Sequence, residues 1–335
     1  MKSFQFIAIC LLTVITSCHS EKTLKVDPLP SWNETTSKHQ IIDFVTAVTD
    51  KNHADFVAAA DRVATFDNDG TLWTEKPIVQ IQFAFDRVQE LSKTHPEWQN
   101  DPIIKAVLNN DLNELLHFGK EGLAKVMMLS HSGMTTDEFD ETVSNWIATA
   151  KHHEKNKSYN ELIYQPMLEV IDYLKENDFK VFIVSGGGMD FMRPWAEKTY
   201  GIPKNQIIGS SIKVSFEHSD EKTVLNRLPE LNFFDDKAAK PVAIHRYIGR
   251  KPIAAFGNSD GDLQMLQWSA SNKKRNLQVY VSHTDDTREY LYGRKDPFSK
   301  LDKGMDQAIK NEWTIADMKK DWKVVYPFEL ISDTK

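Results

Sequence analysis

The chain has 335 residues, of which 41% are hydrophobic and 27% are charged, and its net charge is −7 at pH 7. This composition fits a globular enzyme with a sizeable core, built as one large domain with an insertion or as two domains. The acidic balance offers no basic surface for nucleic acid, so we expect no such partner. It does not exclude an anionic substrate, because a metal ion and backbone amides reverse the field inside a site.

The first 18 residues have the pattern of an export signal. Lys2 provides a positive charge, residues 4–15 are mostly apolar, and residues 15–18 read Ile-Thr-Ser-Cys. The apolar run is too short to cross a bilayer, so we expect cleavage. The last four residues resemble a bacterial lipobox, which predicts a periplasmic or membrane-anchored lipoprotein whose only membrane contact is its lipid anchor. The alternative is a plain secretory signal cleaved near Ser20.

Residues 19–40 are the predicted tether between this signal and the folded part. The stretch is mostly polar and contains Pro28 and Pro30, which is typical of a flexible segment. The only cysteines are Cys10 and Cys18. Cleavage before Cys18 leaves no second thiol, so we expect the core and not a disulfide to provide stability.

The apolar stretch 63–66 predicts a first buried strand. A long helical region follows it, with apolar residues at i, i+3 and i+4 spacing. The predicted helices cover residues 78–91, 103–116, 122–129 and 137–150. Because they are inserted after the first strand, they predict a helical cap over residues 76–159, with the core domain formed by residues 41–75 and 160–335.

From residue 167 onward, predicted strands and helices alternate. The strands cover residues 181–184, 206–210, 253–256 and 278–281, and the helices cover residues 167–174, 190–200, 242–248 and 263–268. Residues 212–216 and 224–228 form a predicted hairpin. The alternation predicts an α/β fold, a Rossmann-like parallel sheet with helices on both faces. In such sheets ligands bind at the carboxyl ends of the strands.

Two aspartates follow the first strand directly. Asp67 and Asp69 are two residues apart, so in extended backbone both carboxylates point toward one small volume. Gly70 allows a sharp turn and a close approach to a ligand. Two such anions repel each other unless a cation lies between them or one carries a proton. The same residue types are also ordinary turn formers, and spacing alone leaves the turn and the metal site equally open.

Polar groups also lie near two later strand ends. Ser185 starts a Ser-Gly-Gly-Gly run before a helix, where exposed amides form an anion site. Residues 257–262 read Gly-Asn-Ser-Asp-Gly-Asp, again a glycine-rich turn with oxygen ligands. Between the two runs, Lys237 and Lys240 each offer an ammonium group before a helix. Each motif alone is typical of a turn, but their order at the ends of three apolar strands indicates a site.

In these residues the chain resembles the haloacid dehalogenase superfamily of hydrolases, in particular its phosphoserine-phosphatase-like phosphatases. The resemblance covers roughly residues 63–280 and includes all four family motifs. The first motif, Asp-x-Asp-Gly-Thr, stands here at residues 67–71. It implies that Asp67 is the nucleophile that forms an aspartyl-phosphate and that Asp69 acts as general acid and then as general base.

The other motifs complete the implied site. The second implies that Ser185 and Gly186 bind the transferring phosphoryl group. The third implies that Lys240, where Lys-Pro opens a helix, is the catalytic-site lysine, with Lys237 as the reserve candidate. Lys240 then offsets charge between nucleophile and phosphate.

The fourth motif places Asn258 and Asp262 on the metal side. With the carboxylate of Asp67 and the backbone carbonyl of Asp69, the resemblance implies a Mg²⁺ site. This motif most often starts with aspartate. An amide oxygen still binds Mg²⁺ but carries one less negative charge, so direct coordination by Asn258 stays open, as does transfer of the anionic role to Asp260 or Asp262. Asp262 is also a candidate for orienting the site.

The resemblance implies a Mg²⁺-dependent phosphomonoester hydrolase, because dehalogenases of this superfamily lack the second aspartate. We expect a small phosphorylated metabolite as substrate, such as phosphoserine or phosphocholine. Two alternatives are phosphotransfer to an acceptor other than water and a non-catalytic, lipid-anchored protein that binds a phosphorylated ligand.

Substrate choice is expected near the start of the cap. Glu75 is a candidate for recognising an amine, although it lies one residue earlier than the family pattern places its glutamate. Trp73 either packs between cap and core or contacts a quaternary ammonium. His283, after the last predicted strand, lies either at the site edge or among satisfied surface residues.

Overall fold

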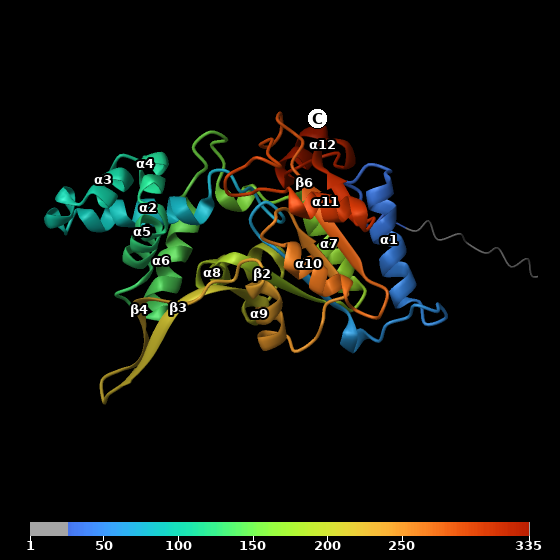
Figure 1. The fold of residues 1–335 in the computed structure, drawn as a ribbon, viewed down its shortest axis with the longest axis horizontal. Coiled ribbons are helices and arrows are strands. Elements are labelled where there is room, and N and C mark those ends of the chain that lie inside the picture. The colour runs from blue at the N-terminus through green and yellow to red at the C-terminus, as the bar shows by residue number, and fades with distance from the viewer. Residues whose placement is uncertain (1–25, 335) are drawn as a thin grey trace, which may run out of the picture.

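A computed structural model describes residues 26–334. The predicted signal and lipobox, and the first part of the predicted tether, lie outside the described residues. Figure 1 shows a core domain with a central sheet and a separate group of helices beside it; a long hairpin extends from the core past the lower end of these helices.

The sheet has seven strands in the order β4-β3-β2-β1-β5-β6-β7. All neighbouring pairs are parallel except β3 and β4, which are antiparallel. The strands are β1 (Val63–Phe66), β2 (Lys180–Gly188), β3 (Ile207–His218), β4 (Thr223–Phe233), β5 (Ala254–Gly257), β6 (Leu277–Ser282) and β7 (Thr314–Asp317). Strand β7 was not predicted, because four residues with mixed polarity give a weak signal.

Helices cover both faces of the sheet, as predicted. In β5, Ala254 and Phe256 pack into one cluster with α1, α7 and α8, whereas Ala255 packs into the other with α9 and α10. The core helices are α1 (Thr36–Thr49), α7 (Gln165–Glu176), α8 (Met189–Tyr200), α9 (Ala239–Tyr247), α10 (Leu263–Ala270), α11 (Lys303–Lys310) and α12 (Met318–Asp321). The α/β fold class is confirmed.

The predicted helical cap is present and has its own small core. Its helices are α2 (Val79–Ser92), α3 (Pro102–Leu108), α4 (Leu112–His117), α5 (Gly119–His131) and α6 (Thr136–Thr149). Apolar residues of α2 to α5 form a separate cluster, while Phe139, Val143 and Ile147 of α6 join the main core. Helix α6 starts with a capping box of Thr135 and Glu138, as their spacing predicts. By packing, α6 therefore links cap and core.

The single helix predicted over residues 103–116 was wrong. It is two helices, because Asn110 has a left-handed φ of 53° and the side chain of Asp111 accepts a hydrogen bond from the Glu114 amide to start α4. Apolar spacing runs through this break, so periodicity alone did not reveal it.

The tether predicted over residues 19–40 was wrong for its second half. Leu29 and Trp32 are fully buried, and the Trp32 indole donates to the carbonyl of Pro166 at 2.9 Å. Helix α1 then begins at Thr36. Lys38 is buried as well, at 2.6 Å from Asp27 and 2.5 Å from Glu34. Two apolar anchors and a paired lysine fix this stretch to the core, although its average composition is polar.

The β3–β4 hairpin is longer than predicted and reaches along the cap (Figure 1). Arg227 of β4 exchanges backbone hydrogen bonds with the segment between α5 and α6. Its buried guanidinium lies 3.8 Å from the centre of the Phe139 ring, 2.6 Å from the carbonyl of His131 and 2.5 Å from Asp190 of α8. One side chain thus fixes hairpin, cap and core helix to each other.

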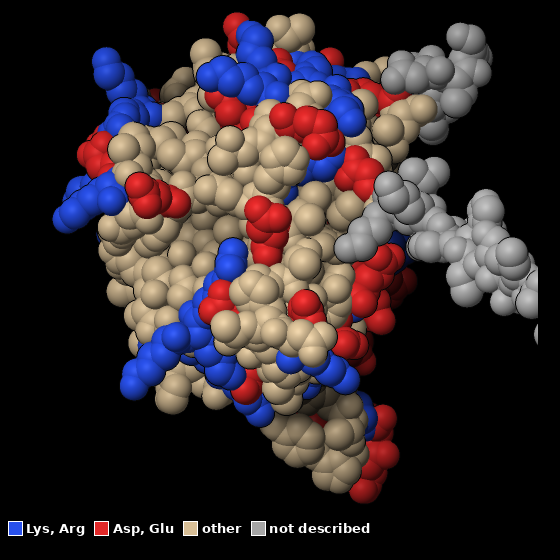
Figure 2. All heavy atoms as spheres, turned by 90° about the vertical axis from the view of Figure 1, so that its right-hand side faces the viewer, with Lys and Arg blue, Asp and Glu red and all other residues tan. Residues whose placement is uncertain are grey.

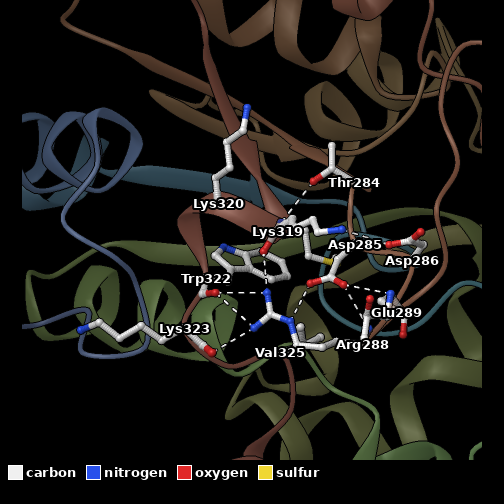
Figure 3. A network of polar contacts seen from close by, with 12 residues as sticks. Thr284, Asp285, Asp286, Arg288, Glu289, Lys319, Lys320, Trp322, Lys323 and Val325 are labelled. Atoms are coloured by element: carbon white, nitrogen blue, oxygen red, sulfur yellow. Dashed lines mark hydrogen bonds and ion pairs between the residues drawn. The ribbon is translucent and has the colours of Figure 1, made fainter.

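A polar network fixes the C-terminal segment to the core (Figure 3). Arg288 pairs with Asp285 at 2.6 Å and donates to the backbone carbonyls of Met318, Trp322 and Lys323. Because one guanidinium holds several carbonyls, the chain after β7 is held beside the loop after β6.

The surface of the core domain is mixed in charge. On the face in Figure 2, lysine and arginine side chains lie among aspartate and glutamate side chains around a mostly uncharged middle. Among residues 26–334, no helix combines the length and apolar character needed to span a bilayer.

Candidate active site

The site is built on the carboxyl end of β1, the central strand. Its backbone continues past Phe66, and the Asp67 amide donates to the carbonyl of Phe256 in β5 at 2.9 Å. The chain then turns tightly at Gly70, which has a φ of 74°. A Cβ on Gly70 would lie 2.1 Å from the Asn258 side chain, so only glycine fits here. The turn brings the first and fourth motifs into contact.

Lys240 joins three strand ends. Its ammonium lies 2.7 Å from Asp67 Oδ1, 2.6 Å from Asp262 Oδ1 and 2.8 Å from the carbonyl of Val184 in β2. Burial lowers the pKa of Lys240, but the two carboxylates raise it by more and keep the lysine charged. By contrast, the Lys237 side chain is 64% exposed and pairs with Asp236. The structure therefore places Lys240, and not Lys237, in the site.

Asp67 is buried beside this lysine. Burial and the neighbouring Asp262 raise its pKa, while Lys240 lowers it. Lys240 holds Oδ1, and Oδ2 accepts no hydrogen bond from the described part of the chain. One oxygen of the predicted nucleophile is thus fixed and the other is unengaged.

Asp262 orients the fourth motif. Its Oδ2 accepts hydrogen bonds from the backbone amides of Asn258 and Ser259, both at 3.0 Å, and its Oδ1 accepts from Lys240. Both oxygens are engaged by protein groups, which agrees with the orienting role predicted for this residue.

Asp69 is held by Trp73. The indole Nε1 donates to Asp69 Oδ1 at 2.9 Å, and the indole stacks on Trp195 of α8 with ring centres 4.5 Å apart. Burial raises the pKa of Asp69, against the Trp73 hydrogen bond and the charge of Lys240. Trp73 is fully buried, so the structure favours packing over the predicted contact with a quaternary ammonium.

The Ser-Gly-Gly-Gly run continues β2 to Gly188 and meets the cap. Ser185 is fully buried, and its hydroxyl accepts from the Gly187 amide at 3.0 Å. Gln80 of α2 reaches this run, where its Oε1 accepts from the Gly188 amide at 2.7 Å. Its Nε2 is buried, has no hydrogen-bond partner in the described residues and lies where a Cβ on Gly187 would be. The predicted phosphate-binding run thus has a buried, unused donor from the cap above it.

Glu75 lies against the turn at Gly70. Its Oε2 accepts from Tyr292 at 2.7 Å and from Asn258 Nδ2 at 2.9 Å. Burial raises the pKa of Glu75 to about 7, against hydrogen bonds that lower it. His283 stacks on Tyr292 and donates from Nε2 to the carbonyl of Gly70 at 2.7 Å. His283 is buried, and burial lowers its pKa to about 4, so a neutral histidine supports the turn through Nε2, while its Nδ1 has no hydrogen-bond partner in the described residues.

The family model of the haloacid dehalogenase-like hydrolases matches residues 64–267, which is more than half of the chain. The chain belongs to this family. The prediction that the protein is an enzyme, a hydrolase of this superfamily, is confirmed. None of the curated proteins is significantly similar in sequence to this chain.

The similar solved structures are distant in sequence. A protein of unknown function from Anaerococcus prevotii is 16% identical, with a TM-score of 0.57, and the match covers 87% of this chain and 94% of that one. A phosphoserine phosphohydrolase-like protein from Francisella tularensis is 14% identical, with a TM-score of 0.40, covering 82% of this chain and all of that one. A substrate-bound phosphoserine phosphatase is 13% identical, with a TM-score of 0.36, covering 82% of this chain and 99% of that one.

The predicted metal ligands lie on one side of this site. Within residues 26–334, no three His, Cys, Asp or Glu side chains are grouped as in an all-side-chain metal site. The predicted ligands are instead of three kinds: the carboxylate of Asp67, the backbone carbonyl of Asp69 and the amide Oδ1 of Asn258. All are oxygens, as Mg²⁺ prefers, and Mg²⁺ keeps several waters in its shell. The residues fit a partly hydrated Mg²⁺ site with a single carboxylate.

Sequence reasoning missed Gln80 and Tyr292 in this hydrolase site. Gln80 belongs to the first cap helix, and Tyr292 follows β6 after ten further residues. Neither lies in a motif, and glutamine and tyrosine are common in ordinary packing. The start of α2 beside the first motif was the only available signal for Gln80.

An open cavity of about 530 Å³ lies elsewhere, lined in part by Gln40, Arg275 and Trp313. It lies near the amino ends of β6 and β7, the edge of the sheet opposite the catalytic groups, and none of those groups lines it.

Proposed function

We propose that the protein is a Mg²⁺-dependent phosphomonoester hydrolase that works through an aspartyl-phosphate. The observation that carries this proposal is the buried contact of Lys240 with both Asp67 and Asp262, beside a second aspartate held by Trp73. Membership of the haloacid dehalogenase-like hydrolases supports it. The names of the phosphoserine phosphatase structures agree with it but are not its basis.

In the first step, the free Oδ2 of Asp67 attacks phosphorus, and the bond from phosphorus to the leaving oxygen breaks. Asp69 gives its proton to that oxygen, for which its raised pKa is suited. In the second step, Asp69 takes a proton from water as the water attacks phosphorus, and Asp67 is released. Ser185 and Gly186 hold the phosphoryl oxygens, and Lys240 offsets their charge. When bound, Mg²⁺ supplies further charge neutralisation at the phosphate.

For the substrate, we propose a small phosphomonoester such as phosphoserine. Phosphocholine has less support, because the indole of Trp73 is covered by Trp195. Export as a lipoprotein stays a proposal from residues 1–18.

The test is hydrolysis of p-nitrophenyl phosphate by Asp67→Asn with Mg²⁺ present. We expect a loss of roughly 10³-fold or more in kcat, as for removal of a catalytic nucleophile. Asp172→Asn is the matched control, because this side chain is 68% exposed on α7. Turnover of the Asp67 variant at the wild-type rate would refute the proposal. A wild-type protein that binds phosphorylated ligands tightly without turnover over Mg²⁺, Mn²⁺ and Co²⁺ would instead be a binding protein.

Added alcohols distinguish hydrolysis from phosphotransfer. If water is the acceptor, inorganic phosphate and p-nitrophenol form in equal amounts. Phosphate that falls behind p-nitrophenol as the alcohol concentration rises would identify a phosphotransferase.

A further inference from the structure

Asn258 is an uncharged candidate ligand with a fixed orientation. Its Oδ1 accepts from the Thr71 hydroxyl at 3.1 Å, and its Nδ2 donates to Glu75 at 2.9 Å. The residue is 1% exposed. Because a carboxylate accepts hydrogen bonds, Glu75 holds the amide nitrogen on its own side and turns Oδ1 toward the first motif.

Glu75 lies against the part of the turn where the metal ligands are expected. A Cβ on Gly70 would lie 2.6 Å from Glu75 Oε2 and 2.1 Å from Asn258 Nδ2. Gly70 directly follows Asp69, whose carbonyl is a predicted ligand. The carboxylate therefore lies beside the Asp69–Gly70 peptide.

Glu75 forms no ion pair with the described residues, although the charge of Lys76 favours its ionised form. The adjacent Lys76 lies 2.9 Å from Asp296, and Lys240 is engaged by Asp67 and Asp262. The Tyr292 hydroxyl and the Asn258 amide donate hydrogen bonds to Glu75, and the Ser299 side chain also lowers the pKa of Glu75. A partly buried carboxylate without an ion-pair partner in the described residues lies next to a ligand that lacks charge.

We propose that Glu75 provides the negative charge of the metal site that Asn258 does not provide, acting through Asn258 as a positioning residue. The Glu75 carboxylate polarises the Asn258 amide so that Oδ1 binds a metal ion more strongly, and the charge of Glu75 attracts the cation. Carboxylates hydrogen-bonded to metal ligands commonly change metal affinity by about 10- to 100-fold. This inference rests on the proposed metal-dependent function and gives Glu75 a role other than recognition of a substrate amine.

The test measures Mn²⁺ binding without substrate, by titration calorimetry and by the EPR signal of free Mn²⁺. It uses the full chain as wild type, Glu75→Gln, Asn258→Asp and the double variant. We expect Glu75→Gln to raise the Kd for Mn²⁺ by about 10-fold or more. Asn258→Asp in the Glu75→Gln background should restore Kd to within about threefold of wild type, because the carboxylate returns at the ligand itself. Glu176→Gln, an exposed substitution at the end of α7, is the matched control.

Unchanged Mn²⁺ binding by Glu75→Gln would overturn the proposal. If the variant then showed only a raised KM for phosphoserine, Glu75 would be identified as an amine-binding residue. A double variant that still binds Mn²⁺ weakly would also overturn the proposal. If Glu75→Gln does not fold, the single variant Asn258→Asp still tests the proposal. Because Glu75 already provides a negative charge, the added carboxylate is redundant, and the Kd for Mn²⁺ should change by less than about threefold. Tenfold tighter binding there would refute the proposal. Mn²⁺ binding is measured without substrate, whereas the hydrolase proposal is tested by turnover of p-nitrophenyl phosphate. Failure of one proposal can therefore be distinguished from failure of the other.

Discussion

Replacement of Lys240 by methionine is the sharpest test of the site. The lysine side chain is 2% exposed, and its ammonium lies 2.7 Å from Asp67 and 2.6 Å from Asp262. Methionine keeps much of the volume and removes the charge. Two buried carboxylates then face each other without their shared counter-charge, so both stability and catalysis depend on this one group.

The expected magnitude follows from this geometry. Removing one partner of a buried ion pair costs about 3–5 kcal/mol, because the remaining charge stays buried. Because the free energy of unfolding of a protein is about 5–15 kcal/mol, the variant is expected to fold, but with little stability left. The pKa of Asp67 is already raised by burial, and losing Lys240 raises it further and removes the charge that stabilises the phosphoryl group. We expect kcat to fall on the order of 10²–10³-fold.

The assay combines urea unfolding, followed by tryptophan fluorescence, with p-nitrophenyl phosphate hydrolysis. Lys237→Met is the control, because its side chain is 64% exposed and pairs only at the surface. Its free energy of unfolding should change by less than about 0.5 kcal/mol. The reasoning fails if Lys237→Met is the more damaging change, or if Lys240→Met loses less than about 1 kcal/mol.

Two further predictions concern Trp73 beside Asp69 and His131, which is buried at the end of the cap helix α5. Trp73→Phe keeps an aromatic ring against Trp195 but removes the hydrogen-bond donor to Asp69. A hydrogen bond to a charged group is worth about 1.5–3 kcal/mol, so kcat should fall about 10-fold or more with little change in KM. An unchanged kcat would show that Asp69 needs no such support. Burial lowers the pKa of His131 to about 3, so its neutral form stabilises the fold fully above the unfolded pKa near 6.5, and this contribution is lost as pH falls from 6.5 toward 3. Wild type should therefore lose about 2 kcal/mol more than His131→Asn between pH 7.5 and pH 5, as measured by urea unfolding, and equal losses would contradict this account.

Much of the site was predictable because its residues are positioned by strand ends. Parallel strands meet at one edge, so Asp67, Ser185 and Asn258 had to lie close together once three strands were recognised. The choice between Lys237 and Lys240 was not settled by spacing. Lys237 lies in a turn with a φ of 54°, and only Lys240 is on the buried face of α9.

Other features depend on contacts between remote segments that leave no local pattern. The tether was misjudged because Leu29 and Trp32 are anchors only when α7 and the C-terminal segment are beside them. The packing of Trp73 was not predictable for the same reason. An indole next to a motif suits a ligand as well as a core, and only the presence of Trp195 excludes the open face.

The segment that leads into the cap is itself part of the site. Within eight residues it carries Trp73, which holds Asp69; Glu75, which holds Asn258; and Gln80, which covers the glycine run. Gln80 lies in the first turn of α2, so a displacement of the cap also displaces a donor next to the phosphate-binding residues. The other end of the cap is fixed by Arg227. The residues between Glu75 and α2 thus connect the cap directly to the group that we propose controls metal affinity. For this reason, metal binding and cap position are expected to be coupled in this enzyme.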